Sequence, residues 1–181
     1  MSKMRVLFLA ANPKDTSMLY LDEEIRAITQ KIRSSDYPDS LELVSKWAVR
    51  ADDLLQSLNE LRPHIVHFSG HGNSEGKIAL LDDNGTTKSV SQQTLTALFT
   101  ALKDNIRVVF LNACYSQSQA QAIVSVIDYT IGMNTAISAQ AAIVFAASFY
   151  RAIGFGRSVQ QAFEQGKVSL MLEGIPSGSY Y

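Results

Sequence analysis

Five short runs of apolar residues recur along the chain, separated by segments with helical spacing. A run that is apolar at nearly every position is typical of a strand covered on both faces of a sheet. One run alternates apolar and polar positions instead, which favours a place nearer the sheet edge. The predicted strands are Met4–Ala11, Leu41–Trp47 (the alternating run), Ile65–Phe68, Ile106–Leu111 and the shorter Tyr129–Met133.

The intervening segments repeat apolar residues every three or four positions, as amphipathic helices do. The first places Leu21, Ile25, Ile28 and Ile32 on one face. Further helices are predicted to begin near Asp52, Ser91, Ser116, Ser138 and Ser158. Strands that alternate with helices predict an α/β fold, with a mainly parallel, Rossmann-like sheet and helices on both faces.

A small β-hairpin interrupts this alternation. The runs Lys77–Leu81 and Thr86–Lys88 flank Asp82-Asp83-Asn84-Gly85. Asn-Gly between two such runs favours a tight hairpin turn. Asp82 and Asp83 are interpreted as turn residues, and Asp82 is also a candidate for holding a basic side chain of a substrate.

Composition limits the class of protein. The 181 residues are 46% hydrophobic and 18% charged, which predicts one domain over residues 1–181, with an irregular tail over 173–181. A net charge of −1 gives no reason to expect nucleic acid or an anionic membrane as partner. The single cysteine fits a reducing, cytoplasmic compartment. The most apolar stretch, 136–156, is interrupted by polar residues, so we expect a buried helix there and no membrane span.

Two predicted strands end in small residues followed by a reactive side chain. The first leads into His67-Phe68-Ser69-Gly70-His71-Gly72, and the second into Leu111-Asn112-Ala113-Cys114-Tyr115-Ser116. Ligands of open α/β sheets bind at the carboxyl edge of the strands. If the two strands are parallel, His71 and Cys114 emerge together at that edge, which predicts a cysteine–histidine dyad.

Such a dyad suits peptide-bond cleavage. A free thiol is only a few per cent thiolate at neutral pH, and a nearby imidazole activates it by taking its proton. Helix-terminal N–H groups after Cys114 would favour the thiolate. The backbone N–H groups of Gly72 and Cys114 are candidates for an oxyanion hole.

Simpler interpretations remain for each residue. A lone cysteine is more often a small buried hydrophobe, and His67 within its strand is interpreted as a packed core residue. His64 is expected on the far side from the proposed site. A zinc site is not favoured, because no paired ligand motif occurs. A nucleotide site is not favoured either, because Gly-x-Gly-x-x-Gly is absent.

The motifs resemble those of bacterial CHAT domains, a branch of the caspase-like cysteine peptidases that also includes separase. The resemblance rests on Val6–Pro13, Leu21–Arg26, the two reactive motifs, Ile131–Met133 and Phe149–Ala152. It implies a caspase-like fold, His71 as general base, Cys114 as nucleophile, and oxyanion donors from Gly72 and Cys114. It implies no metal or cofactor, a protein substrate, a sensor or adaptor partner, and a role in bacterial defence or regulated cell death.

The chain departs from this family pattern at one informative position. Several basic-specific relatives carry an acidic residue two positions before the cysteine to hold a substrate Arg or Lys. Here that position is the neutral Asn112, a candidate pocket residue that does not by itself support cleavage after basic residues. The final segment, Gly174–Gly178, ends sooner than expected, so an excised domain stays open. A non-catalytic interaction domain is the alternative function, and a small-molecule enzyme is a third.

Overall fold

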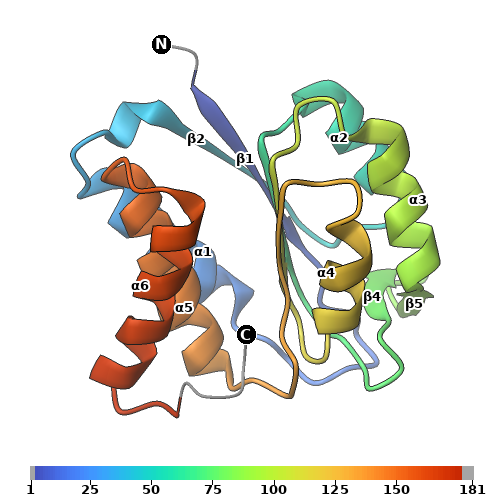
Figure 1. Cartoon of the computed structure of the whole chain (residues 1–181). Helices are drawn as coiled ribbons and strands as arrows, with labels where there is room; N and C mark the ends of the chain where they lie inside the picture. The colour runs from blue at the N-terminus through green and yellow to red at the C-terminus, as the bar shows by residue number, and fades with distance from the viewer. Residues whose placement is uncertain (1–2, 177–181) are drawn as a thin grey trace.

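The core of the protein is a five-stranded, wholly parallel sheet. The structure is a computed structural model that describes residues 3–176. The strand order is β2-β1-β3-β6-β7 (Figure 1). The strands are β1 (Met4–Ala10), β2 (Leu41–Lys46), β3 (Ile65–Ser69), β6 (Val108–Asn112) and β7 (Tyr129–Ile131). All five predicted strands are therefore confirmed. The ends of the predicted domain, and residues 177–181 of the predicted tail, lie outside the described residues.

Helices cover both faces of the sheet, as predicted. Figure 1 shows a layer of helices on each side of the sheet, with the hairpin in one of the two layers. The first layer contains α1 (Leu21–Arg33), α5 (Ala139–Gly154) and α6 (Val159–Leu172). The second contains α2 (Ala51–Leu61), α3 (Gln92–Leu102), α4 (Gln117–Ile123) and the antiparallel strands β4 (Ile78–Leu81) and β5 (Thr87–Val90). A single 3₁₀ turn, Pro38–Ser40, precedes β2.

Position in the sheet explains the apolar pattern of each strand. The central strands β3 and β6 are buried at every residue, because helices cover them on both faces. The edge strand β2 is half-buried after Leu41, as its alternating sequence predicts. At the opposite edge, β7 pairs with only three residues of β6.

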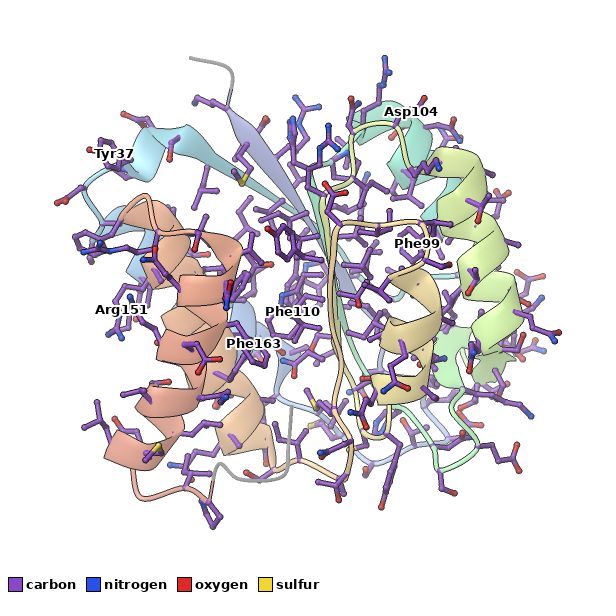
Figure 2. All side chains as sticks on the ribbon, in the orientation of Figure 1. Tyr37, Phe99, Asp104, Phe110, Arg151 and Phe163 are labelled. Carbon is purple, nitrogen blue, oxygen red and sulfur yellow. The ribbon has the colours of Figure 1, made fainter. Side chains whose placement is uncertain are left out.

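Two separate apolar clusters fill the layers. Figure 2 shows Phe110 between the sheet and the α5–α6 layer, and Phe99 on the other side, among α3 and α4. The Phe110 ring meets the edges of Phe145 and Phe149 at centroid distances of 5.7 and 5.5 Å. Phe110 is completely buried, so these contacts anchor β6, the strand that leads to Cys114, against α5.

Helix α1 buries a different stripe from the predicted one. Ile25 is only half-buried, and Glu24 takes its place beside Leu21, Ile28 and Ile32. Both sets recur every three or four residues, so the helical repeat alone does not decide between Glu24 and Ile25. An acidic side chain therefore enters the core beneath the carboxyl edge of the sheet.

The apolar segment near residue 145 is a buried helix, as expected. It forms α5, whose 16 residues pack against α1 and α6. Within residues 3–176, no helix combines the length and the apolar character needed to cross a bilayer.

A glycine contact sets the spacing of α5 and α6. A Cβ added to Gly166 would lie 2.7–2.9 Å from three ring carbons of the buried Phe145. Gly166→Ala normally favours a helix, but here we expect overpacking to lower the free energy of unfolding by about 1–3 kcal/mol. Thermal unfolding tests this, with exposed Val168→Ala on the same helix as control. An unchanged or raised melting temperature for Gly166→Ala would contradict the packing argument.

Candidate active site

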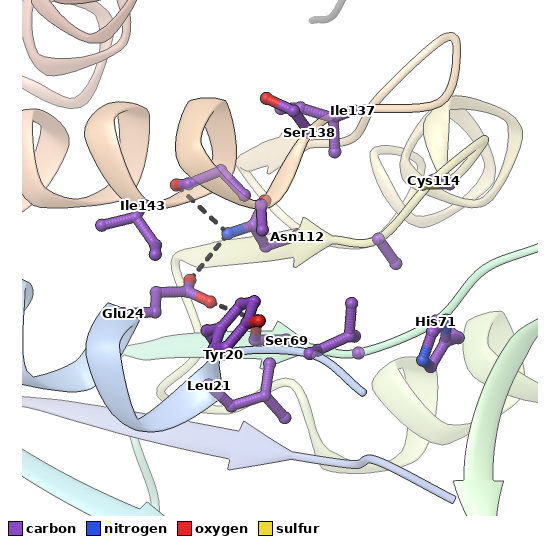
Figure 3. Close-up of a pocket in the computed structure, with 15 residues that line it drawn as sticks. Tyr20, Leu21, Glu24, Ser69, His71, Asn112, Cys114, Ile137, Ser138 and Ile143 are labelled. Atoms are coloured by element: carbon purple, nitrogen blue, oxygen red, sulfur yellow. Dashed lines mark hydrogen bonds between the residues drawn. The ribbon is translucent and has the colours of Figure 1, made fainter. Parts of the chain in front are cut away.

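The two reactive motifs lie at the same edge of the sheet. Strands β3 and β6 are parallel neighbours, and Ser69 at the end of β3 pairs in register with Asn112 at the end of β6. The Gly70 N–H donates to the Asn112 carbonyl at 3.3 Å. His71 and Cys114 follow these paired ends by two residues each, and both line one cavity of about 60 Å³ (Figure 3). The predicted convergence of the two side chains on a shared cleft is therefore present.

Close backbone packing holds the motifs together. A Cβ built on Gly72 would lie 2.1 Å from the Cys114 carbonyl oxygen, far inside van der Waals contact. Only glycine allows this approach, because it has no side chain to separate the two segments. Gly72 therefore contacts the Cys114 backbone directly.

The loop that carries Cys114 is fixed by buried hydrogen bonds. The Ser116 hydroxyl donates to the Leu111 carbonyl at 2.9 Å and accepts from the Met133 N–H at 3.0 Å. Tyr115, which lies between Cys114 and Ser116, has a positive φ of 57°, a conformation that non-glycine residues adopt at some energetic cost. The hydrogen bonds of Ser116 stabilise that strained turn immediately after the thiol.

Helix α4 contributes less to Cys114 than the sequence suggested. The helix begins at Gln117 after the N-cap residue Ser116, so Cys114 lies two residues before the cap. The Gln117 N–H already donates to the Met133 carbonyl at 2.8 Å. The Gln117 N–H is therefore already occupied, and the expected help from helix-terminal N–H groups stays a prediction.

His71 is held by a loop that the sequence did not single out. Its Nε2 lies 2.8 Å from the carbonyl oxygen of Ser17, in the segment between β1 and α1. A carbonyl only accepts, so Nε2 carries the proton and Nδ1 of a neutral ring keeps its lone pair. With its amide oxygen and nitrogen exchanged, the Asn12 side chain would donate to the same carbonyl and accept from the Leu19 N–H, both at 3.2 Å.

The backbone N–H groups of Gly72 and Cys114, which the sequence predicts as oxyanion donors, have no hydrogen-bond acceptor within residues 3–176. Gly72 forms an isolated antiparallel bridge with Ile78, but the two hydrogen bonds of that bridge come from Asn73 N–H and Ala79 N–H. No described group accepts from the N–H of Gly72 or of Cys114.

No hydrogen bond joins the Cys114 thiol to the His71 ring, although both side chains are partly buried at one cavity. Catalytic contacts often tighten only when substrate is bound. Among the described residues, no group of three or more His, Cys, Asp or Glu side chains could hold a metal ion.

The floor of the cavity contains a buried carboxylate. Glu24 of α1 is only 2% exposed, and its side chain accepts three hydrogen bonds. Oε1 lies 2.9 Å from Nε2 of His67 and accepts from the Asn112 amide at 2.7 Å, while Oε2 accepts from the Ser69 hydroxyl (Figure 3). One acidic side chain therefore connects α1 to the ends of both β3 and β6.

His67 completes this network from within the core, as its interpretation as a core residue predicts. The ring is fully buried and stacks on Phe110 at a centroid distance of 4.4 Å. Its Nδ1 lies 3.0 Å from the hydroxyl of Tyr150. Burial, together with the negative charge of Glu24, raises the pKa of Tyr150 well above its usual value. Tyr150 therefore stays protonated and acts as a hydrogen-bond donor.

The structure separates the two candidate pocket residues. Asn112 lines the cavity beside Glu24. Asp82 is not among the lining residues, because its carboxylate accepts from the N–H groups of Asn84 and Thr86 and from the Thr86 hydroxyl within the hairpin turn. Those bonds, above all the one from the Thr86 hydroxyl, lower the pKa of Asp82. His64 lies at the opposite end of β3, where its Nδ1 accepts from the Arg5 N–H.

Sequence reasoning missed Glu24 and Ser17. Glu24 had a readable signal, because it stands three residues after Leu21 and four before Ile28, on the buried stripe of α1. Ser17 had none, because its carbonyl oxygen is the contacting atom and every residue has one.

The arrangement of sheet and helices is a caspase-like α/β fold. The crystal structure of the Drosophila initiator caspase Dronc superimposes with a TM-score of 0.56 at 11% identity, over 90% of this chain and 71% of that one. The model of the CHAT domain family matches residues 4–177. The chain therefore belongs to the CHAT domain family.

Two curated relatives are similar at low identity. A Roc-COR-CHAT protease from an unknown prokaryotic organism is 22% identical in a match 183 residues long that covers 97% of this chain. A probable protease from Gillisia limnaea is also 22% identical, over 147 residues and 80% of this chain. The chain spans only 17% and 26% of the lengths of these two relatives.

The contact between the motifs can be tested at Gly72. In Gly72→Ala, the new methyl group would force the Cys114 carbonyl away, and we expect the free energy of unfolding to fall by about 1–3 kcal/mol. Thermal unfolding measures this, with the exposed neighbour Ser74→Ala as control. Equal melting temperatures for the two variants would show that the close approach is not required.

The buried network can be tested at Tyr150. Tyr150→Phe removes the hydroxyl that donates to His67 and leaves a buried nitrogen unsatisfied, at a cost of about 1–3 kcal/mol. For a chain of this size, we expect the melting temperature to fall by about 2–4 °C per kcal/mol. Tyr129→Phe, at a half-exposed tyrosine on β7, is the control and should change little. Similar shifts in both variants would argue against the network.

Proposed function

We propose that this domain is a caspase-like cysteine endopeptidase, with His71 and Cys114 as its catalytic dyad. One observation carries the proposal: the two side chains line the same cavity at the carboxyl edge of the sheet, and Gly72 packs on the Cys114 backbone. The names of the two curated relatives, both proteases, support the same class of reaction.

The geometry supports a two-step acyl transfer. Nδ1 of His71 accepts the thiol proton of Cys114, while the Ser17 carbonyl holds Nε2–H and fixes the orientation of the ring. The thiolate attacks the substrate carbonyl carbon, and the oxyanion that forms accepts hydrogen bonds from the N–H groups of Gly72 and Cys114. His71 then protonates the leaving amine, and water hydrolyses the acyl-enzyme.

The biological role follows from the family resemblance and is part of the proposal. We infer a proteolytic effector in bacterial defence or regulated cell death, with a protein substrate and a sensor or adaptor as partner. The larger size of both curated relatives supports a setting in which further segments regulate the peptidase.

The direct test compares wild type with Cys114→Ala on a peptide library and on candidate partner proteins. We expect the substitution to reduce cleavage by more than about 10³-fold, because the nucleophile is lost. Ser118→Ala, an exposed position on the following helix, is the matched control and should retain activity. Equal cleavage by wild type and Cys114→Ala would refute the proposal.

A second measurement decides the case in which the isolated domain is latent. Wild type and His71→Ala are alkylated with iodoacetamide across a range of pH. An activated Cys114 reacts faster at neutral pH than a free thiol does, and His71→Ala removes that advantage. A free-thiol profile that is unchanged in His71→Ala, together with no cleavage, would favour a non-catalytic interaction domain.

A further inference from the structure

The cavity next to Cys114 has apolar walls and a polar floor. Leu19, Ile137, Ala142 and Ile143 supply apolar lining. Glu24, Ser69 and Asn112, here called the floor, line the same cavity and lie close together (Figure 3). A side chain with an aliphatic stem and a polar end matches this division. The adjacent thiol makes the cavity the natural place for the residue whose carbonyl would be attacked.

The hydrogen bonds at the floor fit a neutral His67 ring beside a Glu24 carboxylate. If His67 were doubly protonated, its Nδ1–H would donate to Tyr150, and the buried Tyr150 hydroxyl proton would have no acceptor among the described residues. The neutral ring satisfies every group: Tyr150 donates to Nδ1, and Nε2–H donates to Glu24. In this arrangement the Glu24 carboxylate accepts from three neutral donors, the His67 ring, the Ser69 hydroxyl and the Asn112 amide.

No cation among residues 3–176 compensates that charge. None of the arginine and lysine ion pairs involves Glu24, whose only salt-bridge partner is the ring of His67. A carboxylate buried without a cation favours any ligand that brings positive charge close to it.

The floor also holds an unsatisfied acceptor. Asn112 is 4% exposed, and its Oδ1 has no hydrogen-bond partner. Its orientation is fixed, because Nδ2 faces two acceptors, Glu24 Oε1 at 2.7 Å and the Ala142 carbonyl at 3.5 Å. A buried oxygen of this kind requires a donor from outside the described chain.

We infer that Glu24 and Asn112 make this cavity select a basic side chain, lysine or arginine, in the substrate residue immediately before the scissile bond. The inference rests on the proposed function and names its substrate class. The negative charge comes from helix α1, which explains how a basic preference is compatible with a neutral residue two positions before Cys114. The aliphatic stem lies along the apolar walls, and the cationic end donates to Asn112 Oδ1 near the Glu24 carboxylate.

Cleavage of matched peptides tests the preference. Fluorogenic tetrapeptide amides that differ only in the last residue (lysine, arginine, norleucine, glutamine or aspartate) are assayed with the wild-type chain. We expect kcat/KM for the basic peptides to exceed that for norleucine and glutamine by at least about tenfold, or 1.4 kcal/mol. Norleucine lacks the charge and the donor, whereas glutamine keeps an N–H donor on a shorter, uncharged side chain.

Variants then assign the preference to the floor. Glu24→Gln keeps the shape but removes the charge, so the lysine-to-norleucine ratio should fall toward one while norleucine cleavage changes less. Glu23→Gln removes the same charge from an exposed position on the same helix and should leave the ratio unchanged. The wild-type comparison decides the inference even where Glu24→Gln does not fold.

Binding to Cys114→Ala separates this inference from the proposed function. Acetyl-Ala-Ala-Lys-amide and acetyl-Ala-Ala-norleucine-amide are titrated into that variant by NMR, where cleavage is not needed. We expect the lysine peptide to bind at least about tenfold more tightly. Equal affinities, or no binding of the lysine peptide, overturn the inference. Cys114-dependent cleavage that is as efficient after uncharged or acidic residues as after lysine and arginine overturns it too, but leaves the peptidase proposal intact.

Discussion

The hydrogen bonds that Glu24 accepts organise the carboxyl edge of the sheet. One carboxylate of α1 accepts from His67 and Ser69 on β3 and from Asn112 on β6. A buried charge is costly unless several donors compensate it, so the helix and the two strand ends must keep a fixed relative position. Those two strand ends lead directly to His71 and Cys114. The geometry of the candidate dyad therefore depends on a residue that takes no part in acyl transfer.

The loops beyond the strand ends depend on backbone contacts. Gly72 touches the Cys114 carbonyl, Ser116 fastens the turn after the thiol, and the Ser17 carbonyl orients His71. Fixing a site through main-chain atoms in this way permits the surrounding side chains to vary, which is compatible with a shared fold at only 11% identity to a caspase.

Much of the fold could be predicted from the sequence. Helices cover each central strand on both faces, so burial leaves a continuous apolar run that can be read directly. The hairpin was visible in Asn84-Gly85, and the parallel arrangement in the alternation of strands and helices. Because parallel strands end at one edge, the positions of His71 and Cys114 followed from the strand predictions. The sequence by itself therefore determined the sheet, the layers and the edge at which the reactive residues meet.

Tertiary structure alone decided what surrounds that pair. Asp82 looked as available to a substrate as Asn112 did, but the hairpin turn uses its carboxylate, whereas Asn112 faces the cavity. In the sequence Glu24 resembles a solvent-exposed charge of the first helix, whereas in the structure it is buried and contacts His67. The Ser17 carbonyl carries no sequence signal at all. Local periodicity records which residues are buried, but not which polar groups meet across 40 to 90 intervening residues, because only chain packing fixes those distances.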